Sequence, residues 1–306
     1  MNNNAERISM EAITLSKRHS RTLRIGRALL IFGVSVASMG APNAAASSEE
    51  KNAPEKPHRV ATEGTWTPLF NGVNLDNWDR VIGRQGPLRL NEDPDRIFQV
   101  HDGMVHMYKD SADKSEVQYG YILTKKSYSH YHLRFEFKWG TKKFKPRLDM
   151  PRDAGVLYHI AGDKVVWPRS LELQVEEKGV GDFLTVYGTQ AKTTVDPESI
   201  DKQRVGNARF REPAQGGVPF VSGGPKVYWV YRHPDAEQEG WNTVELIVHG
   251  AESAIHKVNG QVVNRVTDLR QLGADGKSWI PLVEGKILFQ AEAAEVFYRN
   301  IEIMEL

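Results

Sequence analysis

The chain has 306 residues, of which 40% are hydrophobic and 26% charged, and these values are typical of a folded globular protein. Its 40 Lys and Arg residues nearly balance its 39 Asp and Glu residues, so the net charge of +1 gives no electrostatic footprint for nucleic acid or an anionic membrane. The absence of cysteine excludes disulfides, thiol nucleophiles, cysteine-ligated zinc and N-terminal cysteine lipidation.

Residues 1–46 have the order of a secretory signal peptide. Basic residues between Lys17 and Arg27 precede the apolar run 28–38, and an Ala-rich segment ends at Ala46. The apolar run is too short to cross a hydrocarbon core of about 30 Å as a helix. We therefore expect cleavage near Ala46, a periplasmic or secreted location and no membrane anchor on the mature chain. An uncleaved N-terminal anchor is the alternative.

Residues 47–63 are polar and contain proline, so we interpret them as a flexible linker. The remainder, 64–306, shows no internal repeat and is predicted to be a single domain. Its first clear element is His132–Trp139, in which Leu133, Phe135, Phe137 and Trp139 alternate with polar residues, as in a half-buried strand.

Further short strands follow along the chain. Asn259 and Gly260 lie between two of them and predict a tight hairpin, because both central residues of such a turn need a positive φ. In the last segment, we expect Phe297, Arg299, Ile301 and Ile303 to share one face. The expected strands are Leu171–Glu176, Thr243–His249, Ala254–Val258, Gln261–Val263, Lys286–Ala291 and Val296–Met304.

Many short strands separated by turn signals indicate an all-β protein, a sandwich or a barrel. Long insertions are expected at 81–96, 142–152, 197–211 and 215–225, and long loops on such a fold commonly shape a binding site. Trp167, Trp229, Tyr228 and Tyr231 lie near these insertions and are candidate sugar platforms, whereas Trp66, Trp78 and Trp139 are expected in the core.

Four stretches follow one another along the chain from Trp66 to near the C-terminus. They are Trp66–Trp78; Ala154–His159 with Leu171–Val175; Trp241–Glu245 with Ile255–Gly260; and Gly285–Gln290 with Ala294–Ile303. Together and in this order they resemble the bacterial 3-keto-disaccharide hydrolase domain family, and the resemblance covers nearly all of the mature chain.

The resemblance implies a concanavalin A-like jelly-roll β-sandwich that is exported and acts on sugars. Relatives cleave 3-keto-glycosides that a separate sugar 3-dehydrogenase produces. A 3-keto group acidifies the C2 proton, so a base can remove it, the C1 substituent can leave by β-elimination, and water can add to give the free 3-keto sugar. This chemistry needs a base, an acid for the leaving oxygen and a group that stabilises the enediolate, but no nucleophile.

Glu172 is the first candidate for the base, because it projects from a predicted strand on the face opposite the core. Gln174 lies two residues further on the same face and is expected to orient a sugar hydroxyl. Glu176 would be about 13 Å from Glu172 along an unbulged strand, beyond the separation of either type of glycosidase carboxylate pair.

The remaining candidates come from other segments. His159 and His256 are the expected acid–base groups, since the ordinary pKa of histidine lies near neutrality. Tyr158, Glu292, Arg299 and Trp229 are expected to contact the sugar, although a structural ion pair is the alternative for Arg299. No cofactor is required. A divalent metal held by Glu172, His159 and Glu292 is an open alternative, and a small carbohydrate is the expected partner.

Three functions remain open from the sequence. The first is a 3-keto-glycoside hydrolase or lyase, which rests on the resemblance. The second is a non-catalytic carbohydrate-binding module on the same sandwich. The third is a conventional glucanase-type glycoside hydrolase, which needs a carboxylate pair at a suitable separation in one cleft.

Overall fold

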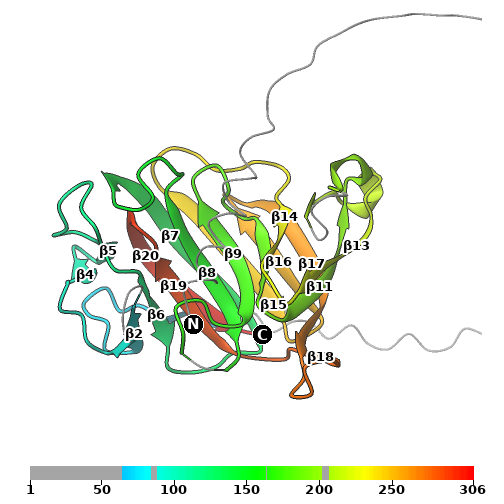
Figure 1. Cartoon of the computed structure of the whole chain (residues 1–306), viewed down its shortest axis with the longest axis horizontal. Coiled ribbons are helices and arrows are strands. Elements are labelled where there is room, and N and C mark those ends of the chain that lie inside the picture. The colour runs from blue at the N-terminus through cyan, green and yellow to red at the C-terminus, as the bar shows by residue number, and fades with distance from the viewer. Residues whose placement is uncertain (1–63, 84–87, 163, 202–206) are drawn as a thin grey trace, which may run out of the picture. The chain divides into compact units, whose positions relative to one another are not determined.

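A computed structural model of the protein describes residues 64–83, 88–162, 164–201 and 207–306. The predicted signal peptide and linker lie outside these residues. Two sheets form the described part (Figure 1), and their paired strands are antiparallel except for β12 and β14. The only helices of this part are the short 3-10 turns η1 (Pro197–Ser199) and η2 (Pro213–Gln215). None of the helices in these ranges has the length and apolar character to cross a bilayer.

The larger sheet has eleven strands, and its neighbours in space are mostly not neighbours in sequence. Along its main path it contains β13 (Val218–Gly224), β11 (Thr189–Val195), β17 (Gln261–Leu272), β16 (Ser253–Val258), β15 (Asn242–His249), β7 (His130–Lys143), β20 (Ala294–Glu305), β5 (Met104–Met107) and β4 (Phe98–His101), while β1 (Thr67–Pro68) pairs with β20 and β18 (Trp279–Pro281) with β17.

The smaller sheet has nine strands. In spatial order they are β12 (Ala208–Arg209), β14 (Tyr228–Tyr231), β10 (Phe183–Val186), β9 (Ser170–Glu176), β8 (Asp153–Ile160), β19 (Lys286–Ala291), β6 (Gly120–Thr124), β2 (Trp78–Ile82) and β3 (Arg89–Leu90). Two packed, mostly antiparallel sheets with this non-sequential strand order are those of a jelly-roll β-sandwich, which confirms the predicted fold class.

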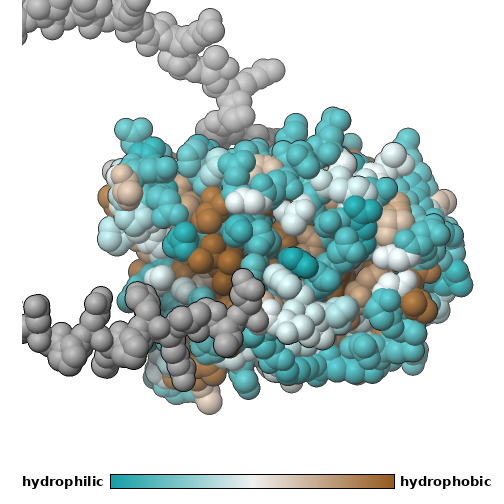
Figure 2. Space-filling model, turned by 180° about the vertical axis from the view of Figure 1, so that it is seen from behind, coloured by the Kyte–Doolittle hydropathy of each residue, from teal (hydrophilic) through white to brown (hydrophobic). Residues whose placement is uncertain are grey.

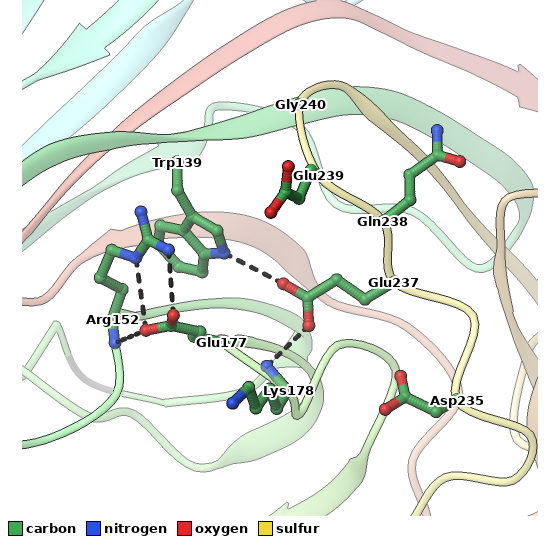
Figure 3. A pocket seen from close by; sticks show the side chains of 9 residues that line it. All are labelled: Trp139, Arg152, Glu177, Lys178, Asp235, Glu237, Gln238, Glu239 and Gly240. Atoms are coloured by element: carbon green, nitrogen blue, oxygen red, sulfur yellow. Dashed lines mark hydrogen bonds and ion pairs between the residues drawn. The ribbon is translucent and has the colours of Figure 1, made fainter.

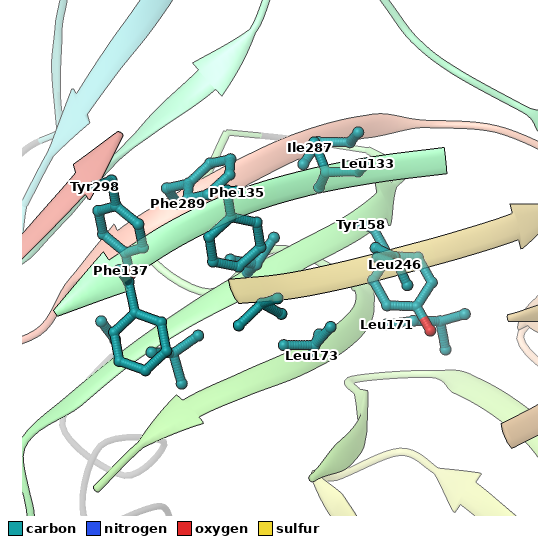
Figure 4. Packing of buried hydrophobic residues seen from close by; sticks show 14 of the residues in the cluster. Leu133, Phe135, Phe137, Tyr158, Leu171, Leu173, Leu246, Ile287, Phe289 and Tyr298 are labelled. Atoms are coloured by element: carbon teal, nitrogen blue, oxygen red, sulfur yellow. The ribbon is translucent and has the colours of Figure 1, made fainter. Parts of the chain in front are cut away.

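The core lies between the two sheets and is built from alternate residues of each strand (Figure 4). In β7, Leu133, Phe135 and Phe137 are buried, and the polar residues between them face outward, as the period-2 pattern predicts. Phe135 of the larger sheet packs edge-on against Phe289 of the smaller sheet, with ring centroids 5.1 Å apart. Aromatic and branched side chains therefore join the two layers.

The predicted hairpin is confirmed. β16 pairs with β17 across Asn259 and Gly260, whose φ angles are 47° and 80°. These positive values are those that an Asn-Gly turn between two strands accommodates.

Three predictions about packing are wrong. Asn300 has a φ of 51° and lies in a register shift of β20, so Arg299 and Phe297 face outward while Ile301 and Ile303 face the core. The segment expected as a 215–225 loop contains β13, which pairs along its whole length with β11. Trp78 is buried as expected, but Trp66 stacks beneath Arg134 outside the core, 3.9 Å from guanidinium carbon to ring centroid.

The surface opposite the view of Figure 1 mixes hydrophilic and hydrophobic residues (Figure 2). Large exposed hydrophobic side chains of the described residues, among them Val73, Val221 and Val283, come from separate parts of the chain. Singly exposed apolar residues are usual on globular proteins, so they do not identify a site by themselves. The side chains that do so lie on the outer face of the smaller sheet.

Candidate active site

Glu172 lies near the middle of the smaller sheet, on the face turned away from the core. Its neighbours Leu171 and Leu173 on β9 enter the core, and the backbone pairs Glu172 with Leu157 on β8 and Leu184 on β10. The residue is only 5% exposed. A carboxyl group is therefore held in a largely desolvated position on a rigid central strand.

A glycine forms the floor beside this carboxyl group. Gly155 on β8 pairs with Gln174 on β9, and a methyl group at position 155 would overlap both the Glu172 Oε1 and the Gln290 Oε1 atoms. The two oxygens thus approach the same point of the sheet from β9 and β19. A Cβ at this position would displace the ends of both side chains, so glycine is what allows the two oxygens to lie this close together.

Two amide side chains flank Glu172. The Gln174 Oε1 accepts a hydrogen bond of 2.9 Å from the backbone N–H of Val175, which leaves the Gln174 amide NH₂ group to donate to a ligand. The Gln290 Oε1 is buried and accepts no hydrogen bond in the structure. Glu172 itself forms no hydrogen bond or ion pair within the described residues. Buried polar atoms normally have partners, so this triplet is a place where a bound polar molecule would be stabilised.

Further along the same face, three carboxylates surround one guanidinium group. Arg147, in the segment between β7 and β8, is 4% exposed and forms an ion pair with Asp153. Its Nη1 atom is 3.0 Å from Glu292 Oε1, and its Nη2 atom is 3.9 Å from Glu176 Oε1. A single cation thus faces three acidic groups at the ends of β8, β9 and β19.

These charges determine how the acidic groups titrate. Burial raises the pKa of Glu172 well above its ordinary value, and the carboxylates of Asp153, Glu292 and Glu176 raise it further. Burial alone would lower the pKa of Arg147, but Asp153 and Glu292 outweigh this effect, so the pKa is raised and the guanidinium stays charged. The carboxyl groups of this face therefore differ in environment. Three of them lie close to the Arg147 guanidinium group, whereas the Glu172 carboxyl group has no ion pair with a cation in the described part of the chain.

The structure does not bring His159 to Glu172. His159, the last residue but one of β8, has a φ of 51° and is fully buried, and its Nδ1 atom lies 3.0 Å from the Leu282 carbonyl oxygen. Burial lowers its pKa to about 4, so the imidazole is neutral near pH 7. Its ring lies 6.2 Å from that of Tyr131, a core residue of the opposite sheet.

His256 and Tyr158 also lie in the core between the sheets. The His256 Nε2 atom is 3.2 Å from the Tyr158 hydroxyl, and its Nδ1 atom is 3.3 Å from the Gly181 carbonyl oxygen. Burial lowers the pKa of His256 to about 4. The catalytic role expected for both histidines, and the sugar contact expected for Tyr158, are not supported by this placement, because the sheet separates them from the Glu172 face.

The last two candidates are divided between the two sheets. Trp229 on β14 pairs with Leu184, so it lies on the outer face in the same row as Glu172, two strands and about 10 Å away. Arg299 lies on the outer face of the other sheet, where its Nε atom is 2.6 Å from Glu136 Oε2. Its guanidinium carbon is 3.8 Å from the Trp241 ring centroid. Arg299 therefore forms a structural ion pair, which was the alternative to the expected sugar contact.

A metal site of Glu172, His159 and Glu292 does not form, because His159 is on the core side of the sheet. Among the described residues, no group of three or more His, Asp or Glu side chains is placed to hold a metal ion. Glu292 is instead an ion-pair partner of Arg147.

Several residues of the site were missed in the sequence, and some carried a usable signal. Asp153 and Gly155 alternate with core residues on β8, and Gln290 follows Leu288 at the same period-2 spacing on β19. These residues could have been found by listing the outward-facing positions of the strands next to the strand of Glu172. Arg147 had no such signal, because it lies outside any strand and reaches the site only through the fold.

Chemically, the site offers one protonatable carboxyl group in a desolvated place, two amides beside it and a buried cation among carboxylates. Such a combination suits proton transfer to and from a neutral polar substrate. It contains no serine, cysteine or threonine nucleophile paired with a base among the residues named above.

A family model described as "3-keto-alpha-glucoside-1,2-lyase-like domain" matches residues 65–304. No curated protein matches the chain. Among solved structures, a protein from Parabacteroides distasonis ATCC 8503 described as a putative glycosyl hydrolase is 20% identical, with a TM-score of 0.44, and the match covers 81% of this chain and 98% of that one. The β-glucanase of Bacillus licheniformis is 11% identical, with a TM-score of 0.38 and coverage of 80% and 99%.

Proposed function

This chain belongs to the 3-keto-alpha-glucoside-1,2-lyase-like domain family of carbohydrate-active enzymes, and on that premise we propose that it is an exported enzyme that cleaves 3-keto-glycosides. The observation that carries the proposal is the place of Glu172, a desolvated carboxyl group without a partner among the described residues, beside the amides of Gln174 and Gln290 on one sheet face.

In the proposed reaction, the Glu172 carboxylate removes the proton from C2 of the 3-keto sugar. The electron pair of the C2–H bond forms the C2–C3 double bond of an enediolate, whose negative charge rests on the C3 oxygen. The C3 carbonyl then re-forms, the C2–C3 electron pair becomes the C1–C2 double bond, and the C1–O bond breaks. The leaving oxygen takes up the proton that Glu172 removed from C2. Addition of water to the unsaturated product gives the free 3-keto sugar, and without that step the enzyme is a lyase.

The flanking groups support this assignment. The Gln174 NH₂ group is free to donate a hydrogen bond to the enediolate oxygen because its own oxygen is fixed by Val175. The raised pKa of Glu172 makes its carboxylate a stronger base than an ordinary glutamate. Arg147 keeps a positive charge within the same acidic cluster and limits the repulsion that ionised Glu172 would meet.

A conventional glycoside hydrolase is the second candidate, because Glu172 and the Arg147-paired carboxylates are acidic groups in unlike environments on one face. The geometry of β9 weighs against the pair Glu172 and Glu176. β9 pairs with β8 in continuous register, so these residues are about 13 Å apart along the strand, outside the range of a glycosidase pair.

Turnover assays distinguish these functions. We expect release of a 3-keto sugar or its 1,2-unsaturated product from 3-keto-trehalose or a 3-keto-β-glucoside, and no cleavage of the unoxidised parents. Cleavage of the parents would instead identify a conventional glycosidase. Binding without turnover of either set would leave a carbohydrate-binding module. Parallel assays with EDTA test for a divalent metal.

Export is part of the proposal and has its own test. The order of basic, apolar and Ala-rich segments before Ala46 supports it. Mass spectrometry of the protein expressed from its full sequence in a Gram-negative host is expected to find an N-terminus near residue 47 in the periplasmic fraction. A chain that retains residues 1–46 in the cytoplasm would contradict export.

A further inference from the structure

A pocket lies away from the Glu172 face, where β7 and the segments next to β8 and β9 meet the segment between β14 and β15 (Figure 3). Its volume is about 490 Å³, within the usual range of small-ligand sites. The lining residues are Trp139, Arg152, Glu177, Lys178, Asp235, Glu237, Gln238, Glu239 and Gly240.

One side of the pocket is a fixed frame. The Trp139 Nε1–H donates to Glu237 Oε1 over 3.2 Å, and the backbone N–H of Lys178 donates to Glu237 Oε2 over 2.6 Å. Arg152 forms a bidentate ion pair with Glu177, in which Nη2 donates to Oε1 over 3.0 Å and Nε donates to Oε2 over 3.3 Å. These bonds hold the indole ring and the polar groups around it in one arrangement.

Two charged side chains of the pocket remain unpaired within the described part of the chain. Figure 3 shows the Glu239 carboxylate directed toward Trp139, whereas Gln238 points away. The Gln238 amide is engaged with the Trp241 carbonyl oxygen at 3.0 Å. Glu239 and the Lys178 ammonium group are both exposed and have no partner there, so a ligand would meet one free acceptor and one free donor.

The free carboxylate of Glu239 and the free ammonium group of Lys178 together favour a neutral, polyhydroxylated ligand. A charged ligand of either sign would approach a like charge, since free groups of both signs line the pocket. A hydroxyl group, in contrast, both donates and accepts, so one polyhydroxylated molecule can bond to Glu239 and Lys178 at once. The Arg152 guanidinium carbon lies over the Trp139 ring, 5.5 Å from its centroid, so the apolar face of a pyranose would contact the part of the indole that lines the pocket.

We propose that this pocket binds a neutral saccharide residue at a position separate from the Glu172 face. Arg152 and Glu177 line the pocket, while their chain neighbours Asp153 and Glu176 belong to the Arg147 cluster. Arg152 and Glu177 lie just beyond β8 and β9 and continue their ladder, since the Glu177 N–H donates to the Arg152 carbonyl oxygen over 2.9 Å. Adjacent residues of a ladder point to opposite sides, so an occupant of the pocket leaves the outer face clear. The protein can thus hold a glycan through one site and process a sugar at the other.

Binding of unoxidised trehalose and cellobiose to the purified chain tests the proposal, because these probes are not substrates of the keto chemistry. The ¹⁵N–¹H signal of the Trp139 indole, assigned by its loss in Trp139→Phe, reports occupancy of the pocket. The dissociation constant of at least one probe is expected to rise about tenfold or more in Glu239→Ala and in Lys178→Asn, which tolerates the positive φ of residue 178.

Two variants provide the controls. Glu252→Ala removes an exposed glutamate from the turn between β15 and β16, and Glu172→Gln alters the proposed catalytic face. Both are expected to retain affinity for the probe. The proposal is overturned if the indole signal does not move at about 10 mM of either sugar, or if affinity depends on Glu172 and not on Glu239 or Lys178. Because binding is measured without turnover, the result is independent of whether keto sugars are cleaved.

Discussion

The Oε1 atoms of Glu172 and Gln290 converge over Gly155, although these residues come from strands on either side of it. Both side chains are nearly buried, and neither of the two oxygens has a hydrogen-bond partner among the described residues. When Glu172 is protonated, its O–H is the one donor of the pair, because the Gln290 oxygen can only accept. The protonation state of Glu172 therefore decides whether the two oxygens attract or repel each other.

Replacing Glu172 by Gln removes the proton-transfer group and keeps its volume. We expect keto-sugar turnover to fall by about 10²–10⁴-fold, the usual contribution of a general acid or base. Thermal stability is expected to stay the same or rise near pH 7, since a buried group that resists ionisation is replaced by a neutral one. The matched control is Glu136→Gln, on the other sheet, whose turnover should be unchanged. Full activity of Glu172→Gln would remove this residue from the mechanism.

The pH dependence follows from the raised pKa of Glu172. As a base, Glu172 must be ionised, so kcat/KM is expected to rise with pH through a pKa well above the ordinary 4.5 of glutamate. Stability should move in the opposite direction. The folded state holds this proton more tightly than the unfolded state, so the contribution is present below the unfolded pKa and is lost as pH rises through the folded pKa.

Melting temperatures across pH separate this effect from other titrations. The difference in melting temperature between Glu172→Gln and the parent chain should grow toward alkaline pH. A difference that is constant with pH, together with an activity profile that is flat above pH 5, would show that Glu172 titrates normally.

Adding a methyl group at Gly155 tests the close approach of the two side chains. Gly155→Ala is expected to cost about 1–3 kcal/mol of stability by overpacking and to reduce turnover, because Glu172 and Gln290 must both move. Gly83→Ala serves as the control, since its methyl group would meet the tip of the Leu88 side chain, 2.8 Å from Cδ2, which can shift. Calorimetry and kcat measure the two effects. Equal behaviour of the two variants would contradict the crowded site.

The histidines provide a test of a purely structural role. The pKa values of His159 and His256 are lowered to about 4, below the ordinary 6.5, so the unfolded chain binds more protons between these values. Stability is therefore complete above about pH 6.5 and is lost as pH falls toward 4, by up to about 3 kcal/mol for each histidine. His256→Gln should lessen this acid sensitivity and keep kcat. The control is His249→Gln, a half-buried histidine at the end of β15, which should change neither the acid sensitivity nor kcat. A large loss of kcat in a stable His256→Gln protein would restore its catalytic assignment.

Arg147 is expected to be important for both stability and activity. Arg147→Met leaves the carboxylates of Asp153 and Glu292 without their cation in a buried place, which typically costs about 3–5 kcal/mol. Arg299→Met breaks a half-exposed pair on the other sheet and should cost less than about 1 kcal/mol, with turnover unchanged. Chemical denaturation measures both variants. Similar small losses would show that the Arg147 cluster is dispensable.

The all-β class was predictable because strands such as β7 and β9 alternate between apolar and polar residues, whereas the jelly-roll type was predicted from the family resemblance. The residues Leu171, Leu173 and Val175 predicted for the core are in it, and Glu172 lies on the other face as expected. The bulge at Asn300 was not predictable from alternation, since one extra residue reverses the faces beyond it. His159 was misplaced for a related reason, because its positive φ at the end of β8 takes it out of the period.

The site was predictable only in part. Residues on neighbouring strands could be aligned once the pairing was known, but strand order in this sandwich is mostly non-sequential. Glu172 and Gln290 are far apart in sequence, and in space only β8 lies between their strands. No local sequence pattern indicates that β9 and β19 lie on either side of β8. The pairing of Arg147 with three carboxylates likewise depends on where a segment outside the strands is placed by the completed sheets.

The register between β8 and β9 is unbroken, and it determines both which residues of β9 enter the core and which residues face the site. Because alternate residues face opposite ways, a slip of β9 by one position would send Glu172 and Gln174 between the sheets and move Leu171 and Leu173 to the outer face. A misregistered chain could not be a folded but inactive enzyme, since the error would bury carboxyl groups where the two sheets meet. A single-residue insertion or deletion within β9 should thus be eliminated by degradation of the chain before its effect on catalysis could be seen.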